Sequence, residues 1–184
     1  MSRPLTAADR SALIRLASTL PVGSDERRAI LARLTSTSRT AAGDVNVRGK
    51  HILGNAQVAG KARVSDRAVV SDRAMVYDYA KVFDKSRVYG SAMVSGRAEV
   101  SDRAMVSGNA VVSGNAKVSG RAQVEGDAEV SGDAQVLDNA VVKDYARIGG
   151  TAYIGGTAII YGGVWDGSEG EVTEGEWMGP GLSA

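Results

Sequence analysis

Few residues in this chain of 184 could carry acid–base or metal chemistry. The chain has one histidine, His51, and no cysteine, so it can offer one imidazole base but no thiolate nucleophile, disulfide or thiolate zinc site. Its 22 basic and 21 acidic side chains leave a net charge of +1, which argues against a protein whose main role is to bind nucleic acid. The sequence therefore predicts no metal, no cofactor and no nucleic-acid partner, with His51 as a weak alternative for a catalytic base.

A six-residue repeat organises the middle of the chain. Every sixth residue from Ile52 to Ile160 is valine or isoleucine. Glycine or aspartate follows two places later, and alanine follows four places later except at Ser86 and, after the last unit's Ile160, at Val164. The Ala-x-Val-x part of each unit predicts a short strand with alanine and valine on one face. The Gly or Asp predicts a turn, because glycine, and to a lesser degree aspartate, accepts a positive φ.

A period this short leaves no room for a hairpin or a crossover helix. The chain must therefore coil as a solenoid, in which each strand pairs in parallel with its equivalent one coil away. Valine suits the pleated surface and alanine suits a narrow interior. A thin interior also explains why the whole chain contains a single phenylalanine.

The unit from Val112 to Lys117, Val-Ser-Gly-Asn-Ala-Lys, resembles the hexapeptide repeat of left-handed parallel β-helix proteins. The resemblance covers about residues 52–163 and implies triangular coils of three hexapeptides, 18 residues each, usually in a homotrimer. About six such coils, at about 4.8 Å per strand, would make a prism on the order of 29 Å tall. One departure is that the family's glycine directly after the aliphatic residue is usually serine here. The Ala-x-Val-x-Gly/Asp-x form of the repeat is similar to the repeats of phage-encoded and bacterial proteins described as transferases without demonstrated activity.

The predicted fold class is thus mainly β, a left-handed parallel β-helix over residues 51–163 with a short N-terminal helical hairpin over residues 1–36. Residues 37–50 are predicted to be a linker. The apolar residues of the hairpin are Leu13, Ile14, Leu16, Leu20, Ile30, Leu31 and Leu34. Two short helices are marginally stable alone, so these side chains must pack against something. Docking to a protein partner and capping of the solenoid both stay open.

Residues 164–184 depart from the six-residue pattern and contain both tryptophans of the chain. A solenoid leaves an open apolar cross-section and unpaired strand edges at its last coil. Trp165, Trp177 and Met178 are therefore predicted to fold over that end as a cap. The alternative is that the two tryptophans form a platform for a ligand.

Arranging the sequence in steps of 18 stacks the outward residues in columns. Met75, Met93 and Val111 share one column, with Tyr77 alongside. Scattered apolar residues on a surface are normal, but three stacked at about 4.8 Å favour a contact between subunits. These four residues are therefore predicted to form the interface of a homotrimer.

One corner column is basic. It consists of Arg67, Lys85, Arg103 and Arg121, with Asp66, Asp84 and Asp102 stacked beside it. The carboxylates would neutralise much of the positive field. The sequence therefore favours a charge ladder that keeps the corner soluble over a groove that binds a polyanion.

The resemblance implies that an acyltransferase is one possible function. Trimeric hexapeptide proteins often bind an acyl-CoA-type donor between subunits, use a histidine as general base and complete the site with an inserted loop. No loop interrupts the register between Ile52 and Ile160, and His51 falls where the repeat begins. The acyltransferase is therefore kept as the alternative.

The favoured function is that of a non-enzymatic structural or adaptor protein. It would be a rigid trimeric prism that docks into a larger assembly, such as a phage virion, through its N-terminal helices. No apolar run approaches the ~18 residues that span a bilayer, and the first residues lack a signal-peptide stretch. The expected location is the cytoplasm or a virion-like particle, with no membrane partner.

Overall fold

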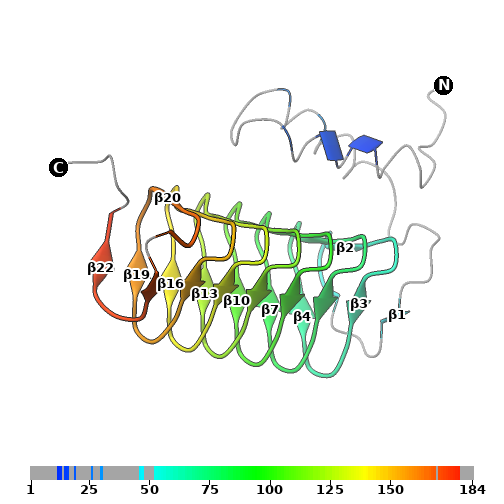
Figure 1. Cartoon of the computed structure of the whole chain (residues 1–184). Coiled ribbons are helices and arrows are strands. Elements are labelled where there is room, and N and C mark those ends of the chain that lie inside the picture. The colour runs from blue at the N-terminus through cyan, green and yellow to red at the C-terminus, as the bar shows by residue number, and fades with distance from the viewer. Residues whose placement is uncertain are drawn as a thin grey trace.

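The computed structural model describes residues 52–168 and 170–178, together with residues 12, 13, 15, 16, 19, 26, 30, 46 and 47. Residues 46–47, 52–168 and 170–178 form a parallel β-solenoid with three strands per coil (Figure 1). Equivalent strands pair in register 18 residues apart, as Met93 does with Val111 and Val94 with Val112. The predicted parallel coil of three hexapeptides is therefore confirmed.

Each strand is two residues long, and the strands stack into three sheets. Sheet A contains β1 (Asn46–Val47), β3 (Arg63–Val64), β6 (Lys81–Val82), β9 (Glu99–Val100), β12 (Lys117–Val118), β15 (Gln135–Val136), β18 (Tyr153–Ile154) and β21 (Glu171–Val172). Sheet B contains β4 (Val69–Val70), β7 (Arg87–Val88), β10 (Met105–Val106), β13 (Gln123–Val124), β16 (Val141–Val142), β19 (Ile159–Ile160) and β22 (Glu176–Trp177). Sheet C contains β2 (Gln57–Val58), β5 (Met75–Val76), β8 (Met93–Val94), β11 (Val111–Val112), β14 (Glu129–Val130), β17 (Arg147–Ile148) and β20 (Val164–Trp165).

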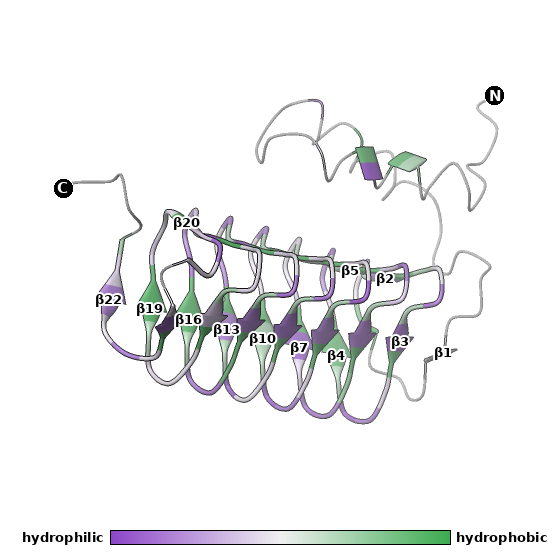
Figure 2. Cartoon of the chain, viewed as in Figure 1, coloured by the Kyte–Doolittle hydropathy of each residue, from purple (hydrophilic) through white to green (hydrophobic). Residues whose placement is uncertain are grey.

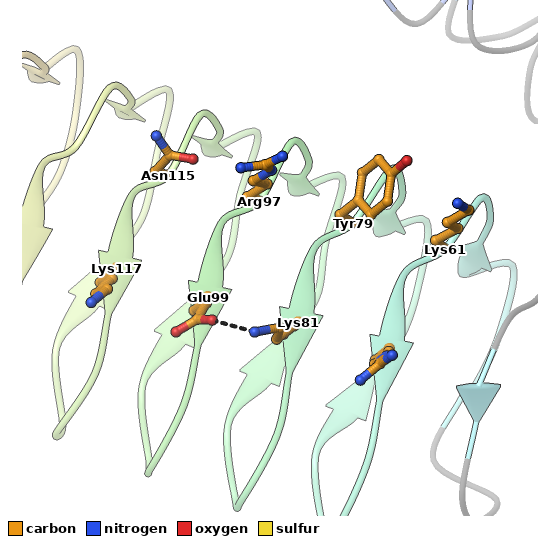
Figure 3. A pocket seen from close by; sticks show the side chains of 8 residues that line it. Lys61, Tyr79, Lys81, Arg97, Glu99, Asn115 and Lys117 are labelled. Atoms are coloured by element: carbon orange, nitrogen blue, oxygen red, sulfur yellow. Dashed lines mark hydrogen bonds and ion pairs between the residues drawn. The ribbon is translucent and has the colours of Figure 1, made fainter.

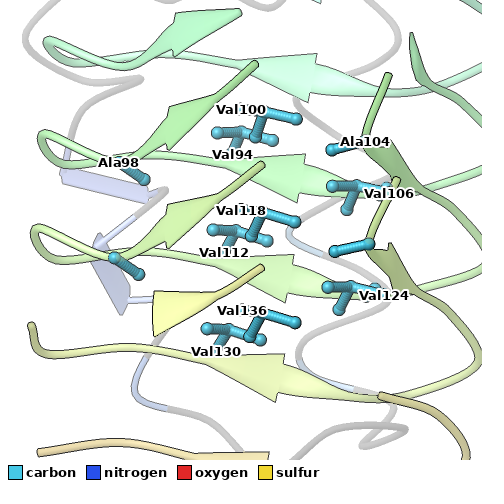
Figure 4. Close-up of a cluster of buried hydrophobic side chains, with 14 of the residues drawn as sticks. Val94, Ala98, Val100, Ala104, Val106, Val112, Val118, Val124, Val130 and Val136 are labelled. Carbon is cyan, nitrogen blue, oxygen red and sulfur yellow. The ribbon is translucent and has the colours of Figure 1, made fainter. Parts of the chain in front are cut away.

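The interior is filled by the repeated valines and alanines. In one coil Val94, Val100 and Val106 come from the three sheets, and each stacks on its equivalent in the next coil (Figure 4). Hydrophobic and hydrophilic residues alternate along the coils, as the colouring in Figure 2 shows. Ser86, the exception among the alanines, is also fully buried, and its hydroxyl lies 2.6 Å from the Phe83 carbonyl oxygen, to which it donates. The one polar side chain in the alanine position is therefore satisfied by the backbone.

The turns are hydrogen-bonded both within a coil and between coils. In a representative turn the Ala98 N–H donates to the Ser95 carbonyl at 3.2 Å, and the Arg97 N–H donates to the Gly114 carbonyl at 2.7 Å. Gly96 has a φ of +67°, and a Cβ atom there would lie 2.8 Å from the Gly114 carbonyl oxygen. Glycine suits this turn because it tolerates both the left-handed backbone and the close approach of the next coil.

The solenoid extends further than the six-residue pattern indicates, to about seven coils instead of six. β20, β21 and β22 continue the three sheets, and Trp165, Val172 and Trp177 pair with Ile148, Ile154 and Ile160. The first of these pairs is 17 residues apart instead of 18, so a turn shortened by one residue hid the last coil from the sequence pattern.

The N-terminal region is described at few positions. Ala12, Leu13, Arg15, Leu16, Thr19, Glu26 and Ile30 are helical, whereas the rest of the predicted hairpin lies outside the described residues. β1 pairs in parallel with β3 and lies within the predicted linker, so strand pairing begins before residue 51. None of the described helical segments is long and apolar enough to cross a membrane.

Candidate functional site

A hollow of about 500 Å³ lies along the outer wall where sheet A meets the corner that follows sheet C. One side is formed by a column of turn residues and the other by the outward residues of sheet A (Figure 3). The turn column is Lys61, Tyr79, Arg97 and Asn115, and the strand column is Arg63, Lys81, Glu99 and Lys117. The solenoid repeat produces this arrangement, because residues 18 apart stack and residues two apart in a strand–turn junction lie next to each other. We call this hollow the basic groove.

The basic groove carries five cations against one carboxylate, a net of four positive charges. The carboxylate of Glu99 accepts a hydrogen bond from the Lys81 ammonium at 2.7 Å, and both side chains are partly exposed. The Lys61 ammonium lies 5.2 Å from the centroid of the Tyr79 ring, which is more than half exposed. The groove therefore combines exposed cations with one accessible aromatic face.

The nearest acidic side chains at the corner of the groove are engaged with other groups. Asp78, which precedes Tyr79, accepts the Gly96 N–H at 3.3 Å. Asp133, the next residue in the turn column, accepts a hydrogen bond from the Asn115 side-chain amide at 2.9 Å. Asp133 thus ends the run of positive charge, and the groove extends over four coils.

The corner column that the sequence singled out lines a second, wider hollow of about 670 Å³. The stacking of Asp66, Asp84 and Asp102 beside the four basic residues is confirmed. Backbone N–H groups of the next coil donate to all three carboxylates, from Asp84 to Asp66 at 3.5 Å, from Asp102 to Asp84 at 3.2 Å and from Gly120 to Asp102 at 3.0 Å. Three acids therefore oppose four bases here, and the net charge is much smaller than in the basic groove.

The four residues predicted to form the trimer interface are brought together on the outer side of sheet C. Met75, Tyr77, Met93 and Val111 form one cluster, with the partly buried Ala59 beside it. The sequence predicted an exposed stripe, but each of the four side chains is only 2–5% exposed within the single chain. Whether they also contact another subunit stays a prediction.

The two tryptophans meet at the end of the solenoid. Their ring centroids are 5.9 Å apart and the ring planes are nearly perpendicular, the edge-to-face geometry that aromatic pairs prefer. Trp165 is buried, whereas Trp177 and Met178 are exposed. Each indole N–H donates to the backbone carbonyl three residues earlier, Trp165 to Gly162 and Trp177 to Glu174. The role of these three residues as a cap stays a prediction.

Two groups near this end have shifted pKa values. The Tyr161 hydroxyl donates to the Glu176 carboxylate at 2.9 Å, and this hydrogen bond, more than burial or charge, raises the pKa of Tyr161. The Asp166 carboxylate accepts the Ser168 N–H at 2.9 Å, which lowers the pKa of Asp166. Both interactions join residues at the last coil.

The remaining predicted site residues are only partly described. Of the predicted docking residues, Leu13 and Ile30 are half-buried and Leu16 is half exposed, whereas Ile14, Leu20, Leu31 and Leu34 lie outside the described residues. His51 also lies outside them. Over the part of the chain that the structure describes, no three His, Cys, Asp or Glu residues are close enough to hold a metal ion.

Sequence reasoning missed the basic groove. It singled out the corner column of Arg67 and did not join the strand column of Arg63, Lys81 and Lys117 to the turn column that begins at Lys61. The sequence contained the signal for the groove, because a turn residue such as Lys61 and the strand residue two places later, Arg63, are neighbours on the wall of a solenoid. Reading adjacent columns together, and counting their charges, would have found it.

A family model described as the YdcK beta solenoid repeat matches residues 98–114. The matched stretch is shorter than one coil, so it supports the repeat type of this wall. Comparison with curated proteins and with solved structures finds no significant match.

Proposed function

We propose that this protein is a non-enzymatic structural or adaptor protein, a rigid trimeric β-helical prism that joins a larger assembly through its N-terminal helices. The observation that carries the proposal is the uninterrupted wall. From β2 to β22 every coil pairs with the next, and the interior is filled by side chains. Such a rod is stiff and presents fixed columns of side chains at a constant spacing, which suits a scaffold.

The hollows of the wall also support a scaffold. Catalysis usually requires a site that closes around its substrate and excludes water. The basic groove and the hollow at the Arg67 corner are both lined mainly by exposed side chains. Their lining suits recognition of a surface or a polymer better than chemistry on a small molecule.

A particle such as a phage virion is the setting we propose for the scaffold. It rests on the style of the repeat, which is similar to that of phage-encoded proteins. The YdcK solenoid match names a repeat and adds no substrate or reaction to the proposal.

The role of the sheet C cluster is tested by Met93→Glu. If Met93 also lies between subunits, the variant should be a monomer, and its melting temperature should fall as well because Met93 is already buried within the single chain. If the contact is within one chain, the variant should melt at least several degrees lower with an unchanged oligomeric state, because a buried unpaired carboxylate is costly. Light scattering separates the two results, and Val141→Glu, at a half-buried outward position of sheet B, is the matched control.

The adaptor role is tested by deletion of residues 1–40. The deleted chain should remain a folded trimer and lose a stoichiometric complex that the full-length chain forms in its native cells. Aggregation of the deleted chain would support capping in place of docking. A clear rise in the melting temperature of the full-length chain with millimolar acetyl-CoA would contradict the scaffold and favour an acyltransferase.

A further inference from the structure

We propose that the basic groove binds a linear acidic polysaccharide that carries one negative charge per sugar unit. This binding site goes beyond the scaffold function, because it assigns a ligand to one face of the wall and does not depend on how the protein assembles. The proposal rests on the charge of the groove, the spacing of its cations and its single exposed aromatic ring.

The charge of the groove selects an anionic ligand. Lys61, Arg63, Arg97 and Lys117 are exposed, and among the described residues no ion pair joins them to an acid. Glu99 engages Lys81 alone. The neighbouring corner, with almost as many cations, has an acid beside nearly every base and so offers no comparable excess. A polyanion therefore gains more in the basic groove than at the neighbouring corner.

The spacing of the groove selects a linear and regular ligand. Equivalent side chains of successive coils are one strand spacing apart, and the four coils of the groove span about 14 Å. An extended sugar chain advances by a similar distance with each unit. Acidic groups on successive units can therefore meet cations on successive coils without bending the polymer or the wall.

The aromatic content of the groove favours a polysaccharide over a nucleic acid. Proteins that bind single strands stack successive bases on several aromatic side chains. This groove has one such ring, Tyr79, with the Lys61 ammonium close to it. A single ring suits the apolar face of one sugar unit, and the acidic group of that unit then lies within reach of Lys61.

The test is calorimetric titration of the full-length protein with a galacturonate hexamer. We expect saturable binding that weakens steeply as salt is raised, because exposed charges are screened. The methyl-esterified hexamer, which has the same sugar backbone without charge, should bind at least tenfold more weakly. No binding of the charged hexamer, or equal binding of both hexamers, would overturn the proposal.

Variants locate the site. The double variant Arg97→Gln/Lys117→Gln should lower the affinity at least tenfold, and Tyr79→Ala should lower it more than Tyr79→Phe. Glu99→Gln should raise the affinity, because it releases Lys81, and a damaged fold would not produce such a gain. Arg73→Gln is the control, since Arg73 is exposed at the corner between sheets B and C.

Two further results would contradict the assignment. If Arg73→Gln lowers the affinity as much as Arg97→Gln/Lys117→Gln does, the polymer responds to the net charge of the protein and not to the groove. Tighter binding of a ten-nucleotide poly(dT) than of the galacturonate hexamer at the same salt would make the ligand a nucleic acid.

Discussion

Seven aspartates of the solenoid occupy turn positions with φ between 57° and 61°, the left-handed region that glycine occupies in the other turns. Their carboxylates explain why aspartate is tolerated there. The Asp72, Asp102 and Asp138 side chains each accept a backbone N–H from the turn one coil further on, at 3.0–3.1 Å. The hydrogen bond to a charged acceptor offsets the cost of the left-handed backbone. Glycine and aspartate thus solve the same turn in two ways.

Substitutions of Asp102 separate the contribution of the carboxylate hydrogen bond from the cost of the left-handed backbone. Asp102→Ala loses the hydrogen bond from Gly120 and keeps a Cβ atom in the left-handed region, whereas Asp102→Gly loses the bond and relieves the backbone. Asp102→Ala should therefore be less stable than Asp102→Gly by about 1 kcal/mol in urea unfolding. Asp133→Ala removes an exposed carboxylate from a residue outside the left-handed set and is the control. Equal stability of the two Asp102 variants would show that backbone strain is not the cause.

At the scale of the elements, the last coil is held by fewer repeated contacts than the coils before it. Among the described strands, β22 pairs with β19 alone. Its position is reinforced by the hydrogen bond from Tyr161 to Glu176 and by the edge-to-face pair of Trp165 and Trp177. The Lys143 ammonium also lies 4.5 Å from the centroid of the Tyr161 ring. The attachment of β22 therefore depends on side chains that are absent from the repeat.

This attachment should weaken in alkali. Because folding raises the pKa of Tyr161, the hydrogen bond to Glu176 stabilises the fold fully below the unfolded pKa of tyrosine, about 10, and is lost as the pH rises through the higher folded value. Tryptophan fluorescence should report release of Trp177 in this range. In Tyr161→Phe the hydrogen bond is absent at every pH, so this step should disappear. Identical alkaline titrations of the two proteins would contradict the assignment.

At the scale of the whole molecule, the protein is a stack of nearly identical coils. Each coil contacts only the coils on either side, so stability is approximately a sum of coil and neighbour contributions. The inward residues are valine and alanine in almost every coil, and one coil can therefore replace another. The outward columns differ from coil to coil, and this is where the groove and the sheet C cluster lie.

Deletion of one whole coil should preserve the fold. Removing residues 113–130 joins Val112 to Ser131, which keeps every later residue in its sheet and on its face. The rod should shorten by one strand spacing, about 4.8 Å, in small-angle scattering. Deletion of the shorter segment 113–121 places Val112 next to Ala122 and turns later inward residues outward, so that chain should aggregate. A folded product of the shorter deletion would contradict the role of the 18-residue period.

The sequence by itself determined the coil, because a period of six with an aliphatic residue, a turn residue and an alanine has one compact solution. It also determined the composition of the interior and the stacking of the corner aspartates beside the basic column. The last coil could not be recognised in this way. Trp165 and Trp177 take inward positions of strands, but the turns that lead to them depart from the period.

Only the tertiary structure decided which outward residues are neighbours and which are covered. The basic groove arises because a turn column and a strand column, separate in the sequence, face each other across a corner. The burial of Met93 on the outer face of sheet C likewise could not be inferred from the repeat. The physical reason is that the period specifies contacts between equivalent positions, whereas contacts between different columns, or with segments outside the repeat, depend on three-dimensional packing.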